Sequence, residues 1–202
     1  MIKALIFDFG GVLVRTEDWS ARRKWEAQLG LPERGLDQAV FNSEVARRAA
    51  RGELPPSEIW VDVARALNLD AAQLDACRRD FWAGDKLDTA LIALIQSLRP
   101  RYQTAILSNA WSDAREMFSR LFGLDQAFDL LIISAEEGLT KPDPRIYQLT
   151  AERLGIQPAE AVFVDDFIEN VQGARAVGMH AIHYQPGLDV RAELAKLGVF
   201  AP

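Results

Sequence analysis

The stretch Ile2-Lys3-Ala4-Leu5-Ile6-Phe7-Asp8-Phe9-Gly10-Gly11 decides the fold of this 202-residue chain. Residues 2 to 7 are nearly all apolar, which is typical of a strand buried on both faces of a parallel sheet. The strand ends in a carboxylate, and two glycines follow closely. Open α/β sheets bind ligands at the carboxyl ends of their strands. Asp8 alone could simply cap a turn, but a carboxylate here can also be a nucleophile or a metal ligand.

Three later segments also place polar side chains after apolar runs. The first ends in Ser108 and Asn109, the second holds Lys141 on a proline-rich loop, and the third ends in Asp165 and Asp166. Two adjacent carboxylates repel each other unless a cation lies nearby. This repetition favours a chemical site over a series of unrelated turns.

The part of the chain after residue 87 alternates between helical and strand patterns. Such alternation predicts an α/β fold with a doubly wound parallel sheet and helices on both faces. We expect helices at 88–98, 112–122, 144–155, 168–177 and 190–197, and strands at 103–108, 129–134, 161–165 and 179–184.

Residues 16–86 show helical periodicity only, without a strand signal. We expect helices at 20–29, 33–51, 57–67 and 71–82, the last preceded by a capping box of Asp70 and Gln73. The block therefore divides the chain into an α/β core of residues 1–15 and 87–202 and an inserted all-helical domain of residues 16–86. Four of the five tryptophans lie in the insert. We expect them mainly to build its core; lining a pocket against the α/β core is the alternative.

Composition limits the partners of the chain. The net charge is −6 and the pI is about 5.0, so nucleic acid is an unexpected partner. The single cysteine, Cys77, excludes an internal disulfide and suits a reducing cytosol. No apolar run reaches the roughly 18 residues of a membrane span, and the N-terminus enters a strand without room for a signal peptide. We expect a cytoplasmic protein without a membrane partner; its oligomeric state stays open.

The four polar segments, taken in order, resemble the four motifs of the haloacid dehalogenase-like hydrolase superfamily over nearly the whole chain. The all-helical insert stands at the cap position of the first subclass, where a cap closes over the site and selects substrates. Gly10 and the turn Arg51-Gly52-Glu53-Leu54 are similar to a subgroup of bacterial sugar-phosphate phosphatases and the phosphatase domain of epoxide hydrolases.

The resemblance implies a magnesium-dependent phosphatase that acts on a small phosphorylated metabolite. Asp8 would be the nucleophile and form an aspartyl-phosphate. Mg²⁺ would be held by Asp8, Asp166 and the backbone carbonyl of Gly10, while Asp165 would order a metal-bound water.

The same resemblance implies a phosphate-binding set. Ser108 and Lys141 would bind and stabilise the phosphoryl group during transfer, beside the backbone at Gly11. Asn109 would either contact phosphate or cap the segment that follows it.

The sequence departs from the family pattern at Gly10, where most phosphatases of the superfamily carry a second aspartate. That aspartate protonates the leaving oxygen, and general acid–base help is typically worth about 10²–10⁴-fold in rate. Two alternatives follow. A metal-independent 2-haloacid dehalogenase lacks the second acid but does not explain the Asp165–Asp166 pair. A non-catalytic domain that binds a phosphorylated ligand does not explain why Asp8 and Lys141 are both present.

Overall fold

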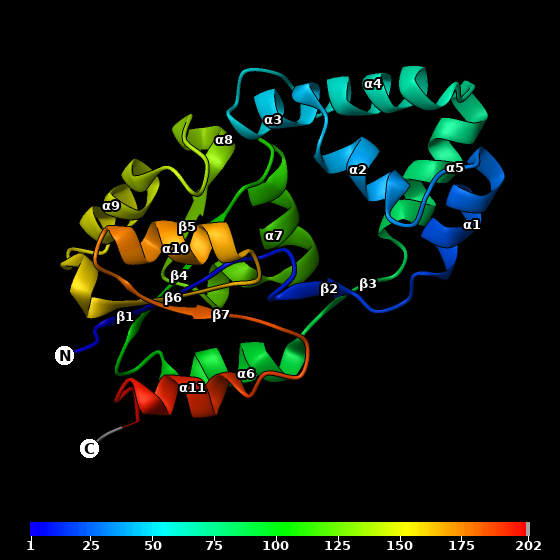
Figure 1. The fold of residues 1–202 in the computed structure, drawn as a ribbon. Helices are drawn as coiled ribbons and strands as arrows, with labels where there is room; N and C mark the ends of the chain where they lie inside the picture. Colours follow the sequence, from blue (N-terminus) through cyan, green and yellow to red (C-terminus); the bar gives the residue numbers. More distant parts are fainter. Residues whose placement is uncertain (201–202) are drawn as a thin grey trace.

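The computed structural model describes residues 1–200, which form a five-stranded parallel sheet with an attached group of helices (Figure 1). The strands are β1 (Ala4–Phe7), β4 (Gln103–Ser108), β5 (Leu130–Ile133), β6 (Ala161–Asp165) and β7 (His180–His183). Their order is β5-β4-β1-β6-β7, so the first strand lies at the centre, with Ile6 opposite Ala105 and Phe163. The predicted doubly wound parallel sheet is confirmed.

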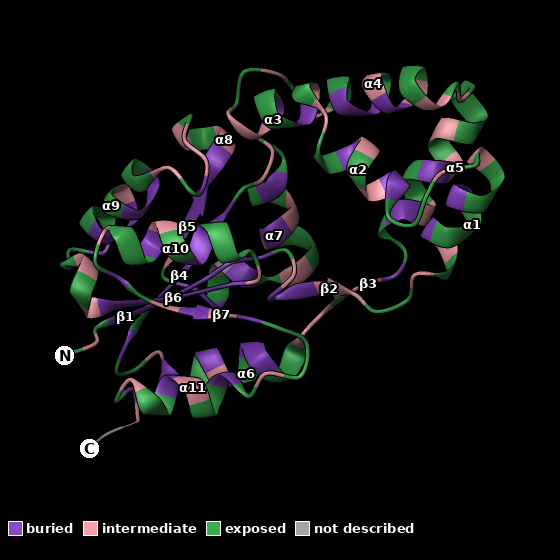
Figure 2. Ribbon diagram, viewed as in Figure 1, coloured by how far each residue is buried: buried purple, intermediate pink, exposed green. Residues whose placement is uncertain are grey.

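Helices cover both faces of the sheet because side chains alternate along each strand. Leu5 and Phe7 pack toward α6 (Thr89–Leu98), α7 (Ala114–Phe122) and α11 (Val190–Lys196). Ala4 and Ile6 pack on the opposite face, toward α9 (Pro144–Arg153) and α10 (Ile168–Ala176). Figure 2 shows these strands as buried and the outer helix faces as exposed. Short elements complete this unit: α8 (Ser134–Glu137) and the 3₁₀ turns Leu124–Gln126 and Pro158–Glu160.

The helical insert comprises α1 (Ser20–Leu29), α2 (Gly35–Phe41), α3 (Glu44–Ala50), α4 (Ser57–Leu67) and α5 (Ala71–Trp82). Two of its four tryptophans, Trp25 and Trp60, are buried with Phe81 in its own apolar core, whereas Trp82 is 38% exposed. The capping box of Asp70 and Gln73 begins α5, which is confirmed.

The single helix predicted at 33–51 is wrong. The chain breaks it at Asn42 and Ser43, where Ser43 is extended (φ −71°, ψ 158°) and its Oγ accepts a hydrogen bond from the amide of Ala46. A serine in this conformation caps a new helix, so α2 and α3 are separate.

The insert is connected to the sheet by two short strands that the sequence did not predict. β2 (Val14–Thr16) pairs antiparallel with β3 (Asp85–Leu87), and the Oγ1 of Thr16 donates to Asp85 at 2.6 Å. Three-residue strands are too short to show a period of two. The expectation that residues 16–86 contain no strand is therefore wrong at both of its ends.

A second contact joins the insert to the sheet unit away from this ribbon. The Oγ of Ser134, at the start of α8, donates to the carbonyl of Ala50 at 2.6 Å. Gly52 lies so near the carbonyl of Ala135 that a Cβ would come within 2.1 Å of its oxygen.

Among residues 1–200, no helix has the length and apolarity needed to cross a membrane.

Candidate active site

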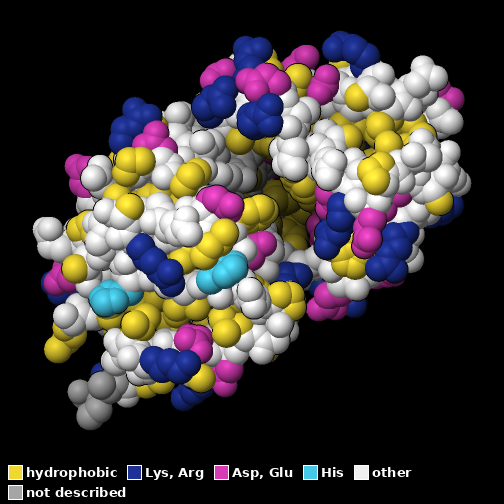
Figure 3. All heavy atoms as spheres, in the orientation of Figure 1, with side chains coloured by type: hydrophobic (Ala, Val, Ile, Leu, Met, Phe, Trp, Pro, Cys, Tyr) yellow, Lys and Arg dark blue, Asp and Glu magenta, His cyan; other side chains and the backbone are white. Residues whose placement is uncertain are grey.

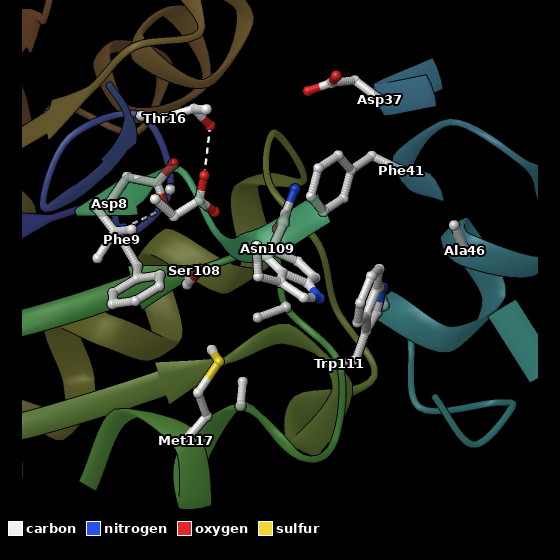
Figure 4. Close-up of a pocket in the computed structure, with 18 of the residues that line it drawn as sticks. Asp8, Phe9, Thr16, Asp37, Phe41, Ala46, Ser108, Asn109, Trp111 and Met117 are labelled. Atoms are coloured by element: carbon white, nitrogen blue, oxygen red, sulfur yellow. Dashed lines mark hydrogen bonds between the residues drawn. The ribbon is translucent and has the colours of Figure 1, made fainter. Parts of the chain in front are cut away.

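Neighbouring strands bring the predicted polar residues to one edge of the sheet. Asp8 follows β1, Ser108 ends β4 and Asp165 ends β6, and β1 lies between the other two strands. All three side chains are buried, as is Lys141. Figure 4 shows Asp8, Ser108 and Asn109 on the sheet side of the cavity, with Phe41 reaching in from α2. The sequence-predicted residues therefore lie together.

The ammonium group of Lys141 lies between two carboxylates. Its Nζ is 2.9 Å from Oδ1 of Asp8 and 2.7 Å from Oδ2 of Asp165. Oδ1 of Asp8 also accepts a hydrogen bond from the amide of Phe9 at 2.7 Å. The Asp8 carboxylate is thus oriented by two donors, which suits a nucleophile that must hold one position.

The side-chain amide of Asn109 holds the backbone of Lys141. Its Oδ1 accepts from the Lys141 amide at 2.7 Å, and its Nδ2 donates to the Lys141 carbonyl at 2.9 Å. Of the two roles expected for Asn109, neither describes this contact. It joins the end of β4 to the lysine loop, which only the tertiary structure brings together.

Both carboxylate oxygens of Asp165 have protein partners, and its expected role of ordering a metal-bound water stays a prediction. Its Oδ1 accepts from the amide of Phe167 at 2.7 Å and from Asn170 at 3.1 Å, while Oδ2 accepts from Lys141. The side chain is fully buried. These bonds make Asp165 the support that fixes Lys141 beside Asp8.

Three carboxylates form a cluster that could hold a cation. Oxygens of Asp8, Asp165 and Asp166 lie within 4.8 Å of one another. Oδ1 of Asp166 is buried and, within residues 1–200, has no hydrogen-bond partner. A Cβ on Gly11, whose φ is 77°, would lie 2.1 Å from Oδ2 of Asp166, so only glycine leaves room there. Oxygen donors of this kind fit a hard cation such as Mg²⁺.

The pKa values of the clustered groups also indicate a site that could hold a cation. Burial raises the pKa of Asp8 to about 7, with Lys141 lowering it and Asp165 raising it. Burial and then Asp165 raise the pKa of Asp166 to about 6. Burial works against the Lys141 ammonium, but Asp8 and Asp165 raise its pKa overall. One ammonium among three carboxylates leaves negative charge that a bound cation would compensate.

The backbone at Gly10 does not require glycine, so the absence of a side chain there affects the chemistry of the site rather than the fold. Gly10 is not in the left-handed region, in contrast to Gly11, and a Cβ built on it meets no atom within 4 Å. The backbone therefore leaves space for a side chain at the position where an acid is absent.

The site opens into a cleft of about 1360 Å³ between the helical insert and the sheet edge. Figure 3 shows this hollow between the two lobes, with hydrophobic side chains inside it. Asp8, Lys141 and Asp166 line one part, and Trp82 and Trp111 line another. Trp82 matches the alternative that an insert tryptophan lines a pocket, whereas Trp111, which follows closely after Asn109, was not among the expected site residues.

Comparisons with known proteins agree with this geometry. Residues 2–178 match the family described as haloacid dehalogenase-like hydrolase. The chain is 30% identical over 200 residues to the sesquiterpene phosphatase astK of Aspergillus oryzae, covering 96% of each chain. The next three relatives are longer, and the chain spans 18% to 39% of their length; the bifunctional epoxide hydrolase 2 of rat is one of them.

Two solved structures illustrate the shared fold. A family member from Bacteroides thetaiotaomicron, solved with magnesium and inorganic phosphate, superposes with a TM-score of 0.78 at 20% identity over 96% of this chain and 99% of that one. The L-2-haloacid dehalogenase of Xanthobacter autotrophicus superposes with a TM-score of 0.67 at 26% identity over 100% and 84%. The chain belongs to the haloacid dehalogenase-like hydrolases, an enzyme family in which its relatives include phosphatases.

Proposed function

We propose that this chain is a magnesium-dependent phosphatase of a small phosphorylated molecule, acting through an aspartyl-phosphate on Asp8. The observation that carries the proposal is the cluster in which the oriented Asp8 lies beside Asp166, whose buried Oδ1 has no partner within the described residues. A dehalogenase attacks carbon and needs no metal ion. The carboxylate pair Asp165 and Asp166, which could bind a metal ion beside Asp8, therefore favours attack on phosphorus.

The side chains have complementary roles in this reaction. An oxygen of Asp8 forms a bond to phosphorus while the ester P–O bond breaks and the alcohol leaves. Water then attacks the aspartyl-phosphate and releases inorganic phosphate, so that ester and water give alcohol and phosphate. Lys141 and Ser108 bind phosphoryl oxygens as negative charge shifts between them. Since Gly10 offers no acid, the leaving oxygen takes its proton from water.

The metal site in this proposal consists of Asp8, Asp166 and the carbonyl of Gly10, with the backbone at Gly11 beside the phosphate. When bound, Mg²⁺ would neutralise phosphate charge so that one anion can approach another. Asp165 holds Lys141 rather than the metal in this assignment.

We also propose that residues 16–86 act as a cap over the α/β core of residues 1–15 and 87–202. The cleft between the two parts and the paired strands β2 and β3 at the crossing support this division. A cytoplasmic location is proposed from the single cysteine, and the charge of −6 makes a small molecule a better partner than nucleic acid.

The test compares activity on p-nitrophenyl phosphate and on 2-chloropropionate, before and after chelation. We expect phosphate release that disappears with chelator, returns with magnesium and is absent in Asp8→Asn. Chloride release that resists chelator would instead establish the dehalogenase. Binding of inorganic phosphate without turnover of any ester would establish the non-catalytic binding domain.

A further inference from the structure

An aromatic cluster lies in the cleft beside the phosphate site. It consists of Phe41 at the end of α2, Trp82 at the end of α5 and Trp111 in the loop after β4, and is called the aromatic cluster below. The ring of Phe41 stacks on Trp111 with centroids 5.8 Å apart and planes at 27°. Trp82 lies 5.9 Å from Phe41 and 6.3 Å from Trp111. The insert and the sheet unit therefore build this surface together.

Two of the three rings of the aromatic cluster are exposed to solvent, although large aromatic side chains are usually buried. Phe41 is 42% exposed and Trp82 is 38% exposed, although each has buried neighbours in the insert. Leu121 and Phe167, 72% and 59% exposed, lie on the sheet side of the same cleft. Single exposed apolar residues need no explanation, but several gathered in one concavity mark a ligand site.

Most arginines that line the cleft pair with acids; Arg78 forms no ion pair among the described residues and lies over the ring of Trp60, 5.7 Å from its centroid. Arg47 pairs with Glu44 at 3.0 Å, and Arg120 pairs with Glu116 at 2.6 Å. The same holds for three further arginines of the lining, which pair with acids: Arg22, Arg34 and Arg51. Because the paired arginines are already neutralised, most of the cleft outside the phosphate site offers a ligand apolar and aromatic surface rather than free positive charge.

The aromatic cluster continues directly from the phosphate site. Ser108 ends β4, Asn109 and Trp111 lie in the loop that follows it, and Asn109 holds the loop of Lys141. A phosphate ester whose phosphoryl group binds at Asp8 would therefore have its alcohol part in the same cleft as the aromatic rings.

We propose that the alcohol part of the phosphate ester is bulky and apolar, an aromatic ring system or a long hydrocarbon, and that it binds against Phe41, Trp82 and Trp111. This inference rests on the phosphatase function proposed above. Apolar and aromatic surface removed from water would supply the binding, and no charged group of the alcohol is required.

The experiment compares esters of primary alcohols, so that their leaving groups are of similar basicity. Decyl phosphate and 2-(2-naphthyl)ethyl phosphate are compared with glycerol 3-phosphate and ribitol 5-phosphate, all with magnesium. We expect kcat/KM to be at least 100-fold higher for the apolar esters. Trp82→Ala should lower kcat/KM for the apolar esters at least 10-fold, mainly through KM, and leave the polyol esters within 3-fold, while Trp82→Phe restores part of the loss.

The matched control is Val61→Ala, which removes a 47% exposed apolar side chain on α4 that does not line the cleft. This control should behave as the unaltered enzyme. A preference for polyol phosphates overturns the inference while leaving the phosphatase intact. An equal loss for both ester classes in Trp82→Ala also overturns it, because the aromatic cluster would then only hold the two units together.

A binding measurement separates this inference from the proposed function. Calorimetry on the magnesium-loaded protein compares decylphosphonate with methylphosphonate, neither of which can be hydrolysed. If no ester is turned over but decylphosphonate binds at least 30-fold more tightly, the apolar ligand class stands and the phosphatase function fails. Equal affinity for both phosphonates overturns the ligand class.

Discussion

Gly52→Ala tests whether the contact between the insert and the sheet unit matters for activity. Gly52 has a φ of 72°, a conformation that costs a residue with a Cβ roughly 1–2 kcal/mol. Its Cβ would also stand 2.1 Å from the carbonyl oxygen of Ala135, across the boundary between the two units. The first effect belongs to the insert alone, whereas the second exists only when the units are in contact.

A matched variant separates the two effects. Gly30 ends α1 with a φ of 65°, and a Cβ there meets no atom within 4 Å. The positive φ should therefore cost Gly30→Ala and Gly52→Ala a similar free energy of unfolding, about 1–2 kcal/mol each, before any effect of the contact between the units. Only Gly52→Ala has to move the units apart and break the bond from Ser134 to Ala50, which is worth about 0.5–1.5 kcal/mol net.

The expected result is a fall in kcat/KM for p-nitrophenyl phosphate in Gly52→Ala of about 5-fold or more beyond that of Gly30→Ala, since about 1.4 kcal/mol corresponds to tenfold. Solution scattering should show a larger radius of gyration for Gly52→Ala alone. Equal kcat/KM and equal scattering for the two variants would refute the reasoning, because closure would then not depend on this contact.

Three other predictions concern the site itself. Gly10→Asp should raise rates on simple alkyl phosphates by up to about 10²–10⁴-fold and leave good leaving groups little changed; rates of the unaltered enzyme that do not depend on the leaving group would show that another group is the acid. The pKa values of Asp8 and Asp166, about 7 and about 6, lie above their ordinary 3.8, so between pH 5.5 and 7.5 these two groups bind more protons in the metal-free folded state than in the unfolded state. The Tm of the metal-free protein should therefore fall as pH rises from 5.5 to 7.5, and magnesium should raise Tm more at pH 7.5 than at pH 5; a flat profile in calorimetry would contradict this. Asn109→Ala removes two hydrogen bonds to the backbone of Lys141, so kcat should fall about tenfold and the free energy of unfolding in urea by about 1–3 kcal/mol. Asn109→Asp keeps one acceptor and should be intermediate; an unchanged kcat in both variants would show that other contacts hold the loop.

Much of the fold could be predicted because its signals are local. The apolar run before Asp8 and the run before Asp165 identify buried strands, and each carboxylate marks a strand end. The capping box at Asp70 needs only the next few residues. The break at Ser43 was missed although it is also local, because helical periodicity continues on both sides of it.

The sequence alone determined the order of the elements and the residue types at the sheet edge, because strand periodicity and caps depend on neighbouring residues. Only the tertiary structure decided that Asn109 holds the backbone of Lys141 and that Phe41 stacks on Trp111. These contacts join segments far apart in the chain, and whether they form depends on how strands order in the sheet and how the insert lies against it. The burial of the Asp166 Oδ1 atom without a hydrogen-bond partner was also decided by the tertiary structure, because several segments of the chain pack together around it.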